Sequence, residues 1–287
     1  MDKKCIDVSA HNCRVPIDWP KVAAFGVQGA VIRAGYGNDI RQADLRFVEN
    51  ITGAIAAGLK VAVYWFSYAD SVADVLKEWT ACKQVIEPYR KNIKFVAFDY
   101  EYASVDYYKK IHGTAPVKEL INAMANTFLN AVKADGYGAA LYTNNDYRKN
   151  IFTAETLAAW NIWLADYSGG PDIKCFMQQT GSTGSVPGIS GNVDMDTLFV
   201  GSNPTVTPQF ECDTTIDLAR ARGGWYQFKV TSKTQPKVNV GSDGVATILP
   251  RCQSGNDYFY YIIAYGASGT ATGVYVNDIL QFNFKIK

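Results

Sequence analysis

The sequence predicts an α/β barrel that is irregular in its last third, followed by a small all-β sandwich. Three features of the 287-residue chain support this prediction. Short β-branched and aromatic runs alternate with stretches of helical periodicity up to about residue 160. Further strand-like runs then follow at intervals too short for helices. Beyond residue 209 the chain contains only short β-rich runs.

The first five predicted strands are each followed by a helical stretch. The strands are "KCIDVSA" (4–10), "GAVIRAGYG" (29–37), "KVAVYWFSYA" (60–69), "KFVAFDYEYA" (94–103) and "GAALYTNND" (138–146). Apolar residues recur at helical spacing over 18–25, 44–57, 72–86, 117–134 and 154–160. Strands that alternate with helices predict βα units and a mainly parallel sheet.

Three more strands complete the predicted barrel. They are "NIWLADYS" (161–168), "KCFMQQTGS" (174–182) and "NVDMDTLFV" (192–200), and the segments between them are short or rich in Gly and Ser. Eight strands, five followed by a helix and three not, fit closure into a barrel. We therefore expect an irregular TIM-like barrel over residues 1–203.

A change of composition predicts a second domain. The segment "GSNPTVTPQ" is polar and contains two prolines, so residues 204–209 are expected to form a linker. The rest of the chain, residues 210–287, contains β-rich runs at 214–220, 225–232, 237–240, 245–250, 257–265, 273–277 and 280–287. Seven short strands without a helical period predict a small β-sandwich.

Composition and charge exclude several classes of function. Apolar residues make up 48% of the chain and charged residues 19%, which is an ordinary globular balance. The net charge is +1 and no basic block is present, so nucleic acid is not an expected partner. Gly and Lys interrupt the apolar stretches, so no membrane span is expected. The N-terminal "MDKKCIDVSAH" lacks the apolar region of a secretory signal.

The cysteines and histidines predict neither a metal site nor a histidine-dependent triad. The six cysteines show no CxxC spacing, and we interpret them as reduced thiols while leaving a Cys212–Cys252 disulfide open. The two histidines, His11 and His112, do not fall at strand ends beside the acids, and no cofactor is predicted. Any chemistry must therefore depend mainly on carboxylates.

The run "VAFDYEYA" places two carboxylates at the end of a hydrophobic strand. Residues i and i+2 project to the same face of a strand, so Asp99 and Glu101 point the same way at the barrel end where active sites assemble. Asp7 ends the first strand, and Asp194 lies on the last strand. Asp196, two residues later, projects to the same face of that strand as Asp194, so the spacing does not choose between them. Crowding and burial should raise at least one carboxyl pKa, as glycosidase acids require.

Aromatic residues near the same strand ends suggest a surface for sugar rings. The group comprises Tyr64, Trp65, Tyr68, Tyr100, Tyr102, Tyr142, Trp163 and Tyr167. Any single member could equally belong to the core. Together with carboxylates they suit a polysaccharide, which Arg33, Asn144 and Gln178 could hydrogen-bond.

Residues 1–200 resemble a glycoside hydrolase family 25 lysozyme, also called the Chalaropsis type. The matching stretches are "IDVSAHN", "IDWPKV", "GAVIRAGYG", "NITGAIAAGLKVAVYWFSYA", "FVAFDYEY", "AALYTNNDY", "IWLADYS" and "QQTGSTGSVPGISGNVDMD". The resemblance implies a (β/α)5(β)3 barrel. It also implies hydrolysis of the β-1,4 bond between N-acetylmuramic acid and N-acetylglucosamine in bacterial peptidoglycan, as in endolysins.

The resemblance also implies roles for individual residues. Glu101 matches the family's acid–base carboxylate, Asp99 the aspartate two residues before it, and Asp7 the N-terminal motif aspartate. Asp194 matches the first acid of the late pair, which favours it over Asp196. The residues expected to bind substrate are Tyr64, Tyr142, Trp163, Arg33 and Gln178.

One departure from the family pattern is visible in the seventh strand. Where the family often has Trp-Gln-Tyr, this sequence has Met177-Gln178-Gln179. The change could alter a sugar subsite, but it removes no carboxylate.

Several expectations follow for partners and location. Peptidoglycan is the expected partner, reached after release from the cytoplasm by a holin-type or other route, or outside the cell. Residues 210–287 are expected to bind the cell wall or to form a homodimer. A non-catalytic wall-binding protein and a barrel hydrolase of chitin-like oligomers are the competing functions.

Overall fold

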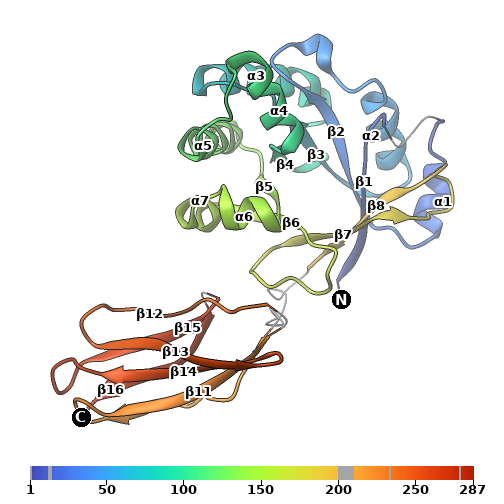
Figure 1. Cartoon of the computed structure of the whole chain (residues 1–287). Coiled ribbons are helices and arrows are strands. Elements are labelled where there is room, and N and C mark those ends of the chain that lie inside the picture. Colours follow the sequence, from blue (N-terminus) through green and yellow to red (C-terminus); the bar gives the residue numbers. More distant parts are fainter. Residues whose placement is uncertain (1, 12–14, 200–209, 233, 278) are drawn as a thin grey trace. The chain divides into compact units, whose positions relative to one another are not determined.

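The chain folds into two compact units, Met1–Val206 and Thr207–Lys287. The computed structural model describes residues 2–11, 15–199, 210–232, 234–277 and 279–287 (Figure 1). The expected linker, residues 204–209, lies outside the described residues. We therefore describe each unit by itself.

The first unit is a closed barrel of eight strands, which confirms the predicted fold class. Strands β1 to β7 pair in parallel with their neighbours, whereas β8 is antiparallel to both β7 and β1. This reversed strand is the irregularity of the last third. The strands are β1 (Lys3–Val8), β2 (Gly29–Tyr36), β3 (Lys60–Phe66), β4 (Ile93–Asp99), β5 (Ala139–Asn144), β6 (Asn161–Ala165), β7 (Met177–Gly184) and β8 (Val193–Leu198).

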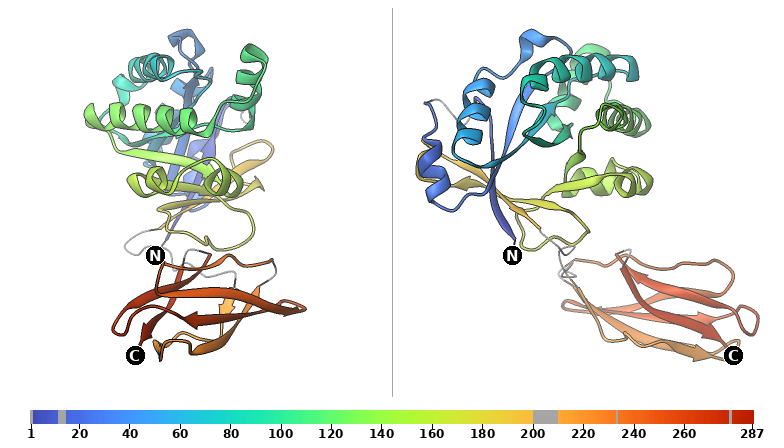
Figure 2. Two further views of the ribbon diagram at one scale, coloured as in Figure 1. Left: turned by 60° about the vertical axis from the view of Figure 1, so that its left-hand side comes forward. Right: turned by 180° about the vertical axis from the view of Figure 1, so that it is seen from behind.

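Helices follow the first five strands and pack on the outside of the barrel, as Figure 2 shows from two directions. No helix among the described residues is both long and apolar enough to span a bilayer. The helices are α1 (Trp19–Ala24), α2 (Phe47–Ala56), α3 (Val72–Ile86), α4 (Tyr102–His112), α5 (Lys118–Ala134), α6 (Asn145–Asn150) and α7 (Ala154–Ala159), with 3₁₀ turns η1 (Ile40–Gln42) and η2 (Glu87–Tyr89).

Two of these helices, α4 and α6, were not expected from the sequence. The predicted fourth strand ran to residue 103, but β4 ends at Asp99 and a helix begins three residues later. The α4 sequence, "YASVDYYKKIH", is rich in tyrosine, which favours strands by propensity. The structure instead places Glu101 in extended backbone as the N-cap residue, where the Ser104 hydroxyl accepts a hydrogen bond from its amide at 3.1 Å.

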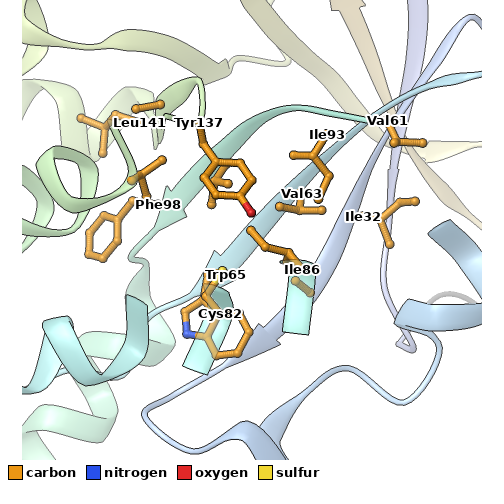
Figure 3. Packing of buried hydrophobic residues seen from close by; sticks show 14 of the residues in the cluster. Ile32, Val61, Val63, Trp65, Cys82, Ile86, Ile93, Phe98, Tyr137 and Leu141 are labelled. Atoms are coloured by element: carbon orange, nitrogen blue, oxygen red, sulfur yellow. The ribbon is translucent and has the colours of Figure 1, made fainter. Parts of the chain in front are cut away.

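Successive side chains of each strand point alternately outward and inward, which creates one apolar layer between the strands and the helices and another inside the barrel. Ile32, Val63 and Phe98 face outward and pack in the same cluster as Cys82 and Ile86 of α3 (Figure 3). Each large aliphatic or aromatic side chain buried in this way contributes roughly 1.5–3 kcal/mol to folding. The inward-facing residues form a separate core of Cys5, Val31, Ala62, Ala97, Ala140, Tyr142, Trp163 and Met177.

The second unit is an all-β sandwich of two four-stranded sheets, as expected. One sheet has the order β10-β16-β15-β12 and the other β13-β14-β11-β9. The sequence predicted seven strands and missed the short β9. The strands are β9 (Phe210–Cys212), β10 (Leu218–Arg220), β11 (Trp225–Ser232), β12 (Val238–Val240), β13 (Ala246–Ser254), β14 (Asp257–Ala264), β15 (Ala271–Val276) and β16 (Ile279–Ile286).

The structure does not contain the disulfide that the sequence left open. Cys212 lies on β9 and Cys252 on β13, which are opposite edges of one sheet, and both thiols are free. Three strand spacings of about 4.8 Å separate them, well beyond the ~7 Å Cα separation that a disulfide tolerates.

Candidate active site

The alternation of side chains between the two faces of each strand brings the four predicted acids to one end of the barrel. Asp99 ends β4 and Glu101 follows two residues later, while Asp7 of β1 lies directly opposite Asp194 of β8 in the strand register. All four carboxyl groups line a cavity of about 300 Å³ at the mouth. The structure therefore brings together the acids that the sequence placed on three different strands.

The direction of β8 explains why Asp194, and not Asp196, reaches this cavity. Because β8 runs antiparallel to β1, its first residues lie at the mouth and its later ones lie deeper. Asp194 pairs with Asp7, whereas Asp196 pairs with Cys5 in the layer below. The Asp196 carboxylate is buried and accepts a 2.7 Å hydrogen bond from Trp163 Nε1. Asp196 thus packs beneath the cavity.

Glu101 is partly buried at the junction of β4 and α4. Burial raises the pKa of its carboxyl group, and the nearby Asp194 carboxylate raises that pKa further. Hydrogen bonding with Tyr142 acts in the opposite direction. Glu101 therefore retains its proton to a higher pH than an exposed glutamate, as a general acid must.

Asp7 and Asp99 are more deeply buried, with 5% and 6% of their surfaces exposed. Burial, with the Asp194 carboxylate next, raises the pKa of Asp7 to about 7. Burial also raises the pKa of Asp99 well above its usual range, and the Glu101 and Asp7 carboxylates add to the rise. Asp99 Oδ1 has no hydrogen-bond partner among the described residues.

Gln179 of β7 joins several of the cavity residues. Its Nε2 donates to Asp7 Oδ2 at 2.8 Å, and its Oε1 accepts from Tyr142 at 3.1 Å and from Tyr167 at 2.7 Å. The amide thus fixes one acid and two tyrosine rings at the mouth. Gln179 was not among the substrate-binding residues expected from the sequence, although it lies two residues after Met177, which faces the barrel interior, and so shares its face of the strand.

The expected substrate residue Gln178 points elsewhere. Its side chain is buried, and Nε2 donates to the carbonyl oxygens of Asp166 at 2.7 Å and Gly169 at 2.6 Å. Adjacent residues of a strand face opposite sides, so only one of the two glutamines can line the cavity. Contrary to expectation, Gln178 therefore does not line the carboxylate cavity, whereas Gln179 does.

Arg33 also lines the cavity, where a buried ion pair holds it. Its Nε donates to Asp44 Oδ2 at 2.7 Å, and the backbone amide of Ala10 donates to the same oxygen at 3.0 Å. The pair fixes one cationic group beside the acids, and its charge opposes the rise in the pKa of Asp99.

The predicted aromatic group divides among several places. Tyr64, Tyr142 and Trp163 line the cavity, and the Trp163 ring lies 4.7 Å from Tyr142 and 6.1 Å from Tyr64 between centroids. Trp65 and Tyr100 belong instead to the buried core outside the barrel. Tyr167 joins the cavity together with Ser9 and Phe66, two residues that the sequence analysis did not name.

A second hollow of about 550 Å³ continues from the acids. It shares Glu101, Tyr142 and Tyr167 with the carboxylate cavity and extends it toward Tyr102 and Asn144. The Asn144 amide oxygen is already engaged in capping α6. Glu101 thus lies where the two hollows meet.

The two histidines behave differently from each other. His11 lines the carboxylate cavity, contrary to the expectation that neither histidine lies beside the acids. His112 lies apart from it and approaches Asp70 at 3.2 Å. Within the described ranges, no group of three His, Cys, Asp or Glu side chains is arranged to hold a metal ion.

A family model for glycosyl hydrolases family 25 matches residues 6–188, nearly the whole barrel unit. This chain belongs to glycosyl hydrolases family 25. Asp7, Asp99 and Glu101 lie within the matched segment, and Asp194 follows shortly after it. No curated protein sequence matches the chain.

Solved structures show the same barrel. The modular autolysin LytC from Streptococcus pneumoniae is 24% identical, with a TM-score of 0.60 over 69% of this chain and 47% of that chain. The catalytic domain of endolysin ply40 from bacteriophage P40 of Listeria monocytogenes is 20% identical, with a TM-score of 0.57 over 70% and 94%. The present chain thus spans about half the length of LytC.

One further structure covers both units. The spore cortex lytic enzyme SleM from Clostridium perfringens is 13% identical, with a TM-score of 0.57 over 99% of this chain and 98% of that chain. This likeness shows that a fold similar to the whole chain occurs in another protein.

Proposed function

We propose that this protein is a peptidoglycan hydrolase of the lysozyme type, which cleaves the β-1,4 bond between N-acetylmuramic acid and N-acetylglucosamine. One observation supports the proposal most directly. Glu101 lies at the junction of two hollows, with its pKa raised, and Asp99, Asp7 and Asp194 line the same cavity. Family membership and the autolysin and endolysin folds agree with this proposal.

In the proposed reaction Glu101 acts as the general acid and then as the general base. Its retained proton passes to the glycosidic oxygen as the bond breaks, and the resulting carboxylate later removes a proton from the attacking water. Burial favours the protonated form before the reaction, because it disfavours the carboxylate. The Asp194 carboxylate raises this pKa further through its charge.

Asp99 would assist at the anomeric carbon by holding the substrate's 2-acetamido group as that group attacks. Its Oδ1 is buried and has no hydrogen-bond partner among the described residues, so it can accept an amide N–H. Glu101 keeps an extended backbone just beyond the end of β4, and residues i and i+2 of extended backbone lie roughly 6–7 Å apart, between the separations typical of retaining and inverting enzymes. Inversion would be recognised by the anomeric configuration of the product, whereas direct carboxylate attack, which also retains that configuration, would be recognised by a covalent glycosyl-enzyme.

The aromatic lining would position the sugar rings. Tyr64, Tyr142 and Trp163 present ring surface in the cavity, and Arg33 and Gln179 add hydrogen-bonding groups. The second hollow supplies room for sugars on the other side of Glu101. A polymer bound across both hollows would have its scissile bond beside the acid.

The second unit would keep the enzyme on its polymeric substrate. On β11 and β14, Trp225 is 60% exposed and lies 5.1 Å from Tyr261 between ring centroids, and the Arg251 guanidinium lies 5.4 Å from the Tyr261 ring. An exposed indole ring beside a half-buried tyrosine ring and a cationic group suits a carbohydrate face of the cell wall.

The test is mass spectrometry of soluble fragments from purified Gram-positive cell walls. The proposal predicts new reducing ends on N-acetylmuramic acid. New reducing ends on N-acetylglucosamine, or cleavage of chitin oligomers without cleavage of walls, would assign a different bond. Release of no fragments from any wall would support a non-catalytic wall-binding protein.

A further inference from the structure

A cavity of about 540 Å³ adjoins the carboxylate cavity, and the proposed reaction does not use it. The two are separated by a pair of rings: Phe66 lines the carboxylate cavity, Tyr68 lines this one, and their centroids lie 5.1 Å apart. We call it the tyrosine cavity. It is lined by Tyr36, Gly37, Asn38, Gln42, Tyr68, Asp70, Asp74, Glu78, Ala103, Tyr107 and Ile111.

Glu78 of α3 is a buried acid of this cavity. The residue is fully buried, and its Oε1 accepts a 2.8 Å hydrogen bond from the Tyr68 amide. Its Oε2 has no hydrogen-bond partner among the described residues. A buried carboxyl oxygen without a donor is unfavourable, so a ligand that brings a donor to it would be stabilised.

Two further acids, Asp74 and Asp70, carry the negative charge of the cavity, since burial raises the pKa of Glu78 to about 8. Asp74 accepts a hydrogen bond from Asn38 at 2.7 Å and approaches the exposed Lys77 at 3.5 Å, and Asp70 approaches His112 at 3.2 Å. No lysine or arginine is among the cavity-lining residues. The lining therefore favours a cation over an anion or a neutral ligand.

Three tyrosine rings form the remaining wall. Tyr68 lies 6.0 Å from Tyr36 and 5.0 Å from Tyr107 between centroids, in edge-to-face geometry, and Ile111 adds an exposed apolar side chain beside them. Ring faces attract organic cations, and apolar side chains accommodate a hydrocarbon stem. Acids, ring faces and an apolar wall together suit an alkylammonium group.

We propose that the tyrosine cavity binds the free primary amine of a wall peptide. The chemical group is the side-chain ammonium of a diamino acid, which a peptide that is not cross-linked leaves uncovered. Its N–H groups would reach Glu78 Oε2, and its methylene stem would lie along Tyr107 and Ile111. The inference rests on the proposed function, because the glycan in the adjoining cavity would carry the peptide.

The first experiment compares two forms of one wall preparation. One keeps its free amines, and the other is chemically N-acetylated, which removes the charge while leaving the glycan unchanged. The full chain should cleave the free-amine walls about fivefold to tenfold faster, chiefly through a lower KM. Equal rates on the two walls would overturn the inference and leave the proposed function intact.

Variants test whether the preference for free-amine walls over N-acetylated walls depends on the tyrosine cavity. Glu78→Gln replaces an acceptor with a donor and should abolish the preference. Because this residue is buried, the exposed Tyr107 supplies a second pair: Tyr107→Leu should lose most of the preference and Tyr107→Phe, which keeps the ring, should retain it. Asp106→Asn, on the same helix but outside the cavity lining, is the matched control. A preference unchanged in both Glu78→Gln and Tyr107→Leu would contradict the assignment.

A binding measurement decides the inference even if no wall is cleaved. Nα-acetyl-L-lysine N-methylamide is titrated into the full chain and followed by NMR, beside its Nε-acetyl derivative. Binding of the amine that is at least fivefold tighter, and that is lost in Tyr107→Leu, supports the site. Equal or absent binding of both probes overturns it.

Discussion

At the scale of single residues, the raised carboxyl pKa values link the cavity's chemistry to its stability. Burial and the Asp194 carboxylate raise the pKa of Asp7 to about 7, from the ordinary value of 3.8. The folded protein therefore binds this proton more tightly than the unfolded chain does. The resulting stabilisation is complete below about pH 4 and disappears as the pH rises toward 7.

The corresponding prediction concerns Asp7→Asn, which imitates the protonated side chain. Wild-type stability should fall between pH 4 and pH 7 by up to ~1.4 kcal/mol per pH unit from this group, and the variant should lack that component. The measurement is the urea midpoint of the barrel unit, followed by tryptophan fluorescence across this pH range.

The matched control is Asp106→Asn, whose carboxylate is 72% exposed. It should follow the wild-type curve at every pH. Parallel curves for wild type and Asp7→Asn would show that Asp7 has an ordinary pKa in the folded protein.

At the scale of elements, the direction and register of strands decide which side chains reach the site. The sequence placed Asp7, Asp99 and Glu101 correctly at the mouth, because each follows or ends an apolar strand. It could not choose between Asp194 and Asp196 from parity alone, since the choice depends on β8 running antiparallel. That direction is a property of barrel closure, and only the family resemblance pointed to Asp194, the acid that lines the cavity.

The same limit applies to β7 and α4. "MQQTG" contains adjacent glutamines, so strand parity is ambiguous until neighbouring strands fix the register. The tyrosines of α4 favour a strand by propensity, whereas the structure has a helix there, with Glu101 as its N-cap residue and the Glu101 amide hydrogen-bonded to Ser104. His11 reaches the cavity on the loop after β1, where periodicity gives no information.

The register of β7 makes a testable prediction for its two glutamines. Gln179→Ala removes the amide that holds Asp7, Tyr142 and Tyr167, so kcat/KM on cell walls should fall about tenfold or more while folding is retained. Gln178→Ala instead leaves two backbone carbonyls without their donor, so it should lower stability by ~1–3 kcal/mol.

Steady-state rates and urea midpoints of the two variants provide the measurement. The reversed pattern, with Gln178→Ala losing turnover and Gln179→Ala losing only stability, would show that β7 is shifted by one residue.

At the scale of the whole molecule, the chain combines a barrel with a sandwich that has its own core. Phe228, Val230, Ile262 and Phe284 are buried within the sandwich, which accounts for its compactness as a unit. The sequence predicted this division from composition. It could not predict the face that the sandwich offers to a partner, because exposure of Trp225 depends on which side of β11 faces the core.

A wall-binding role for the sandwich predicts that the full chain sediments with purified cell walls through this face. Trp225→Ala should weaken co-sedimentation about tenfold. Lys237→Ala should not change it, because Lys237 lies just before β12, an edge strand of the other sheet. Analytical ultracentrifugation of the same variants tests the alternative, which is that this face forms a homodimer. Unchanged wall binding with a dimer that Trp225→Ala dissociates would assign the face to self-association.

The central claim is that crowded acids at the barrel mouth keep Glu101 protonated for transfer to a glycosidic oxygen. The most direct test is the turnover of Glu101→Gln on purified cell walls, measured beside wild type together with wall co-sedimentation. We expect kcat to fall by about 10³-fold or more, with wall binding unchanged. A variant that keeps most of its turnover would contradict the account.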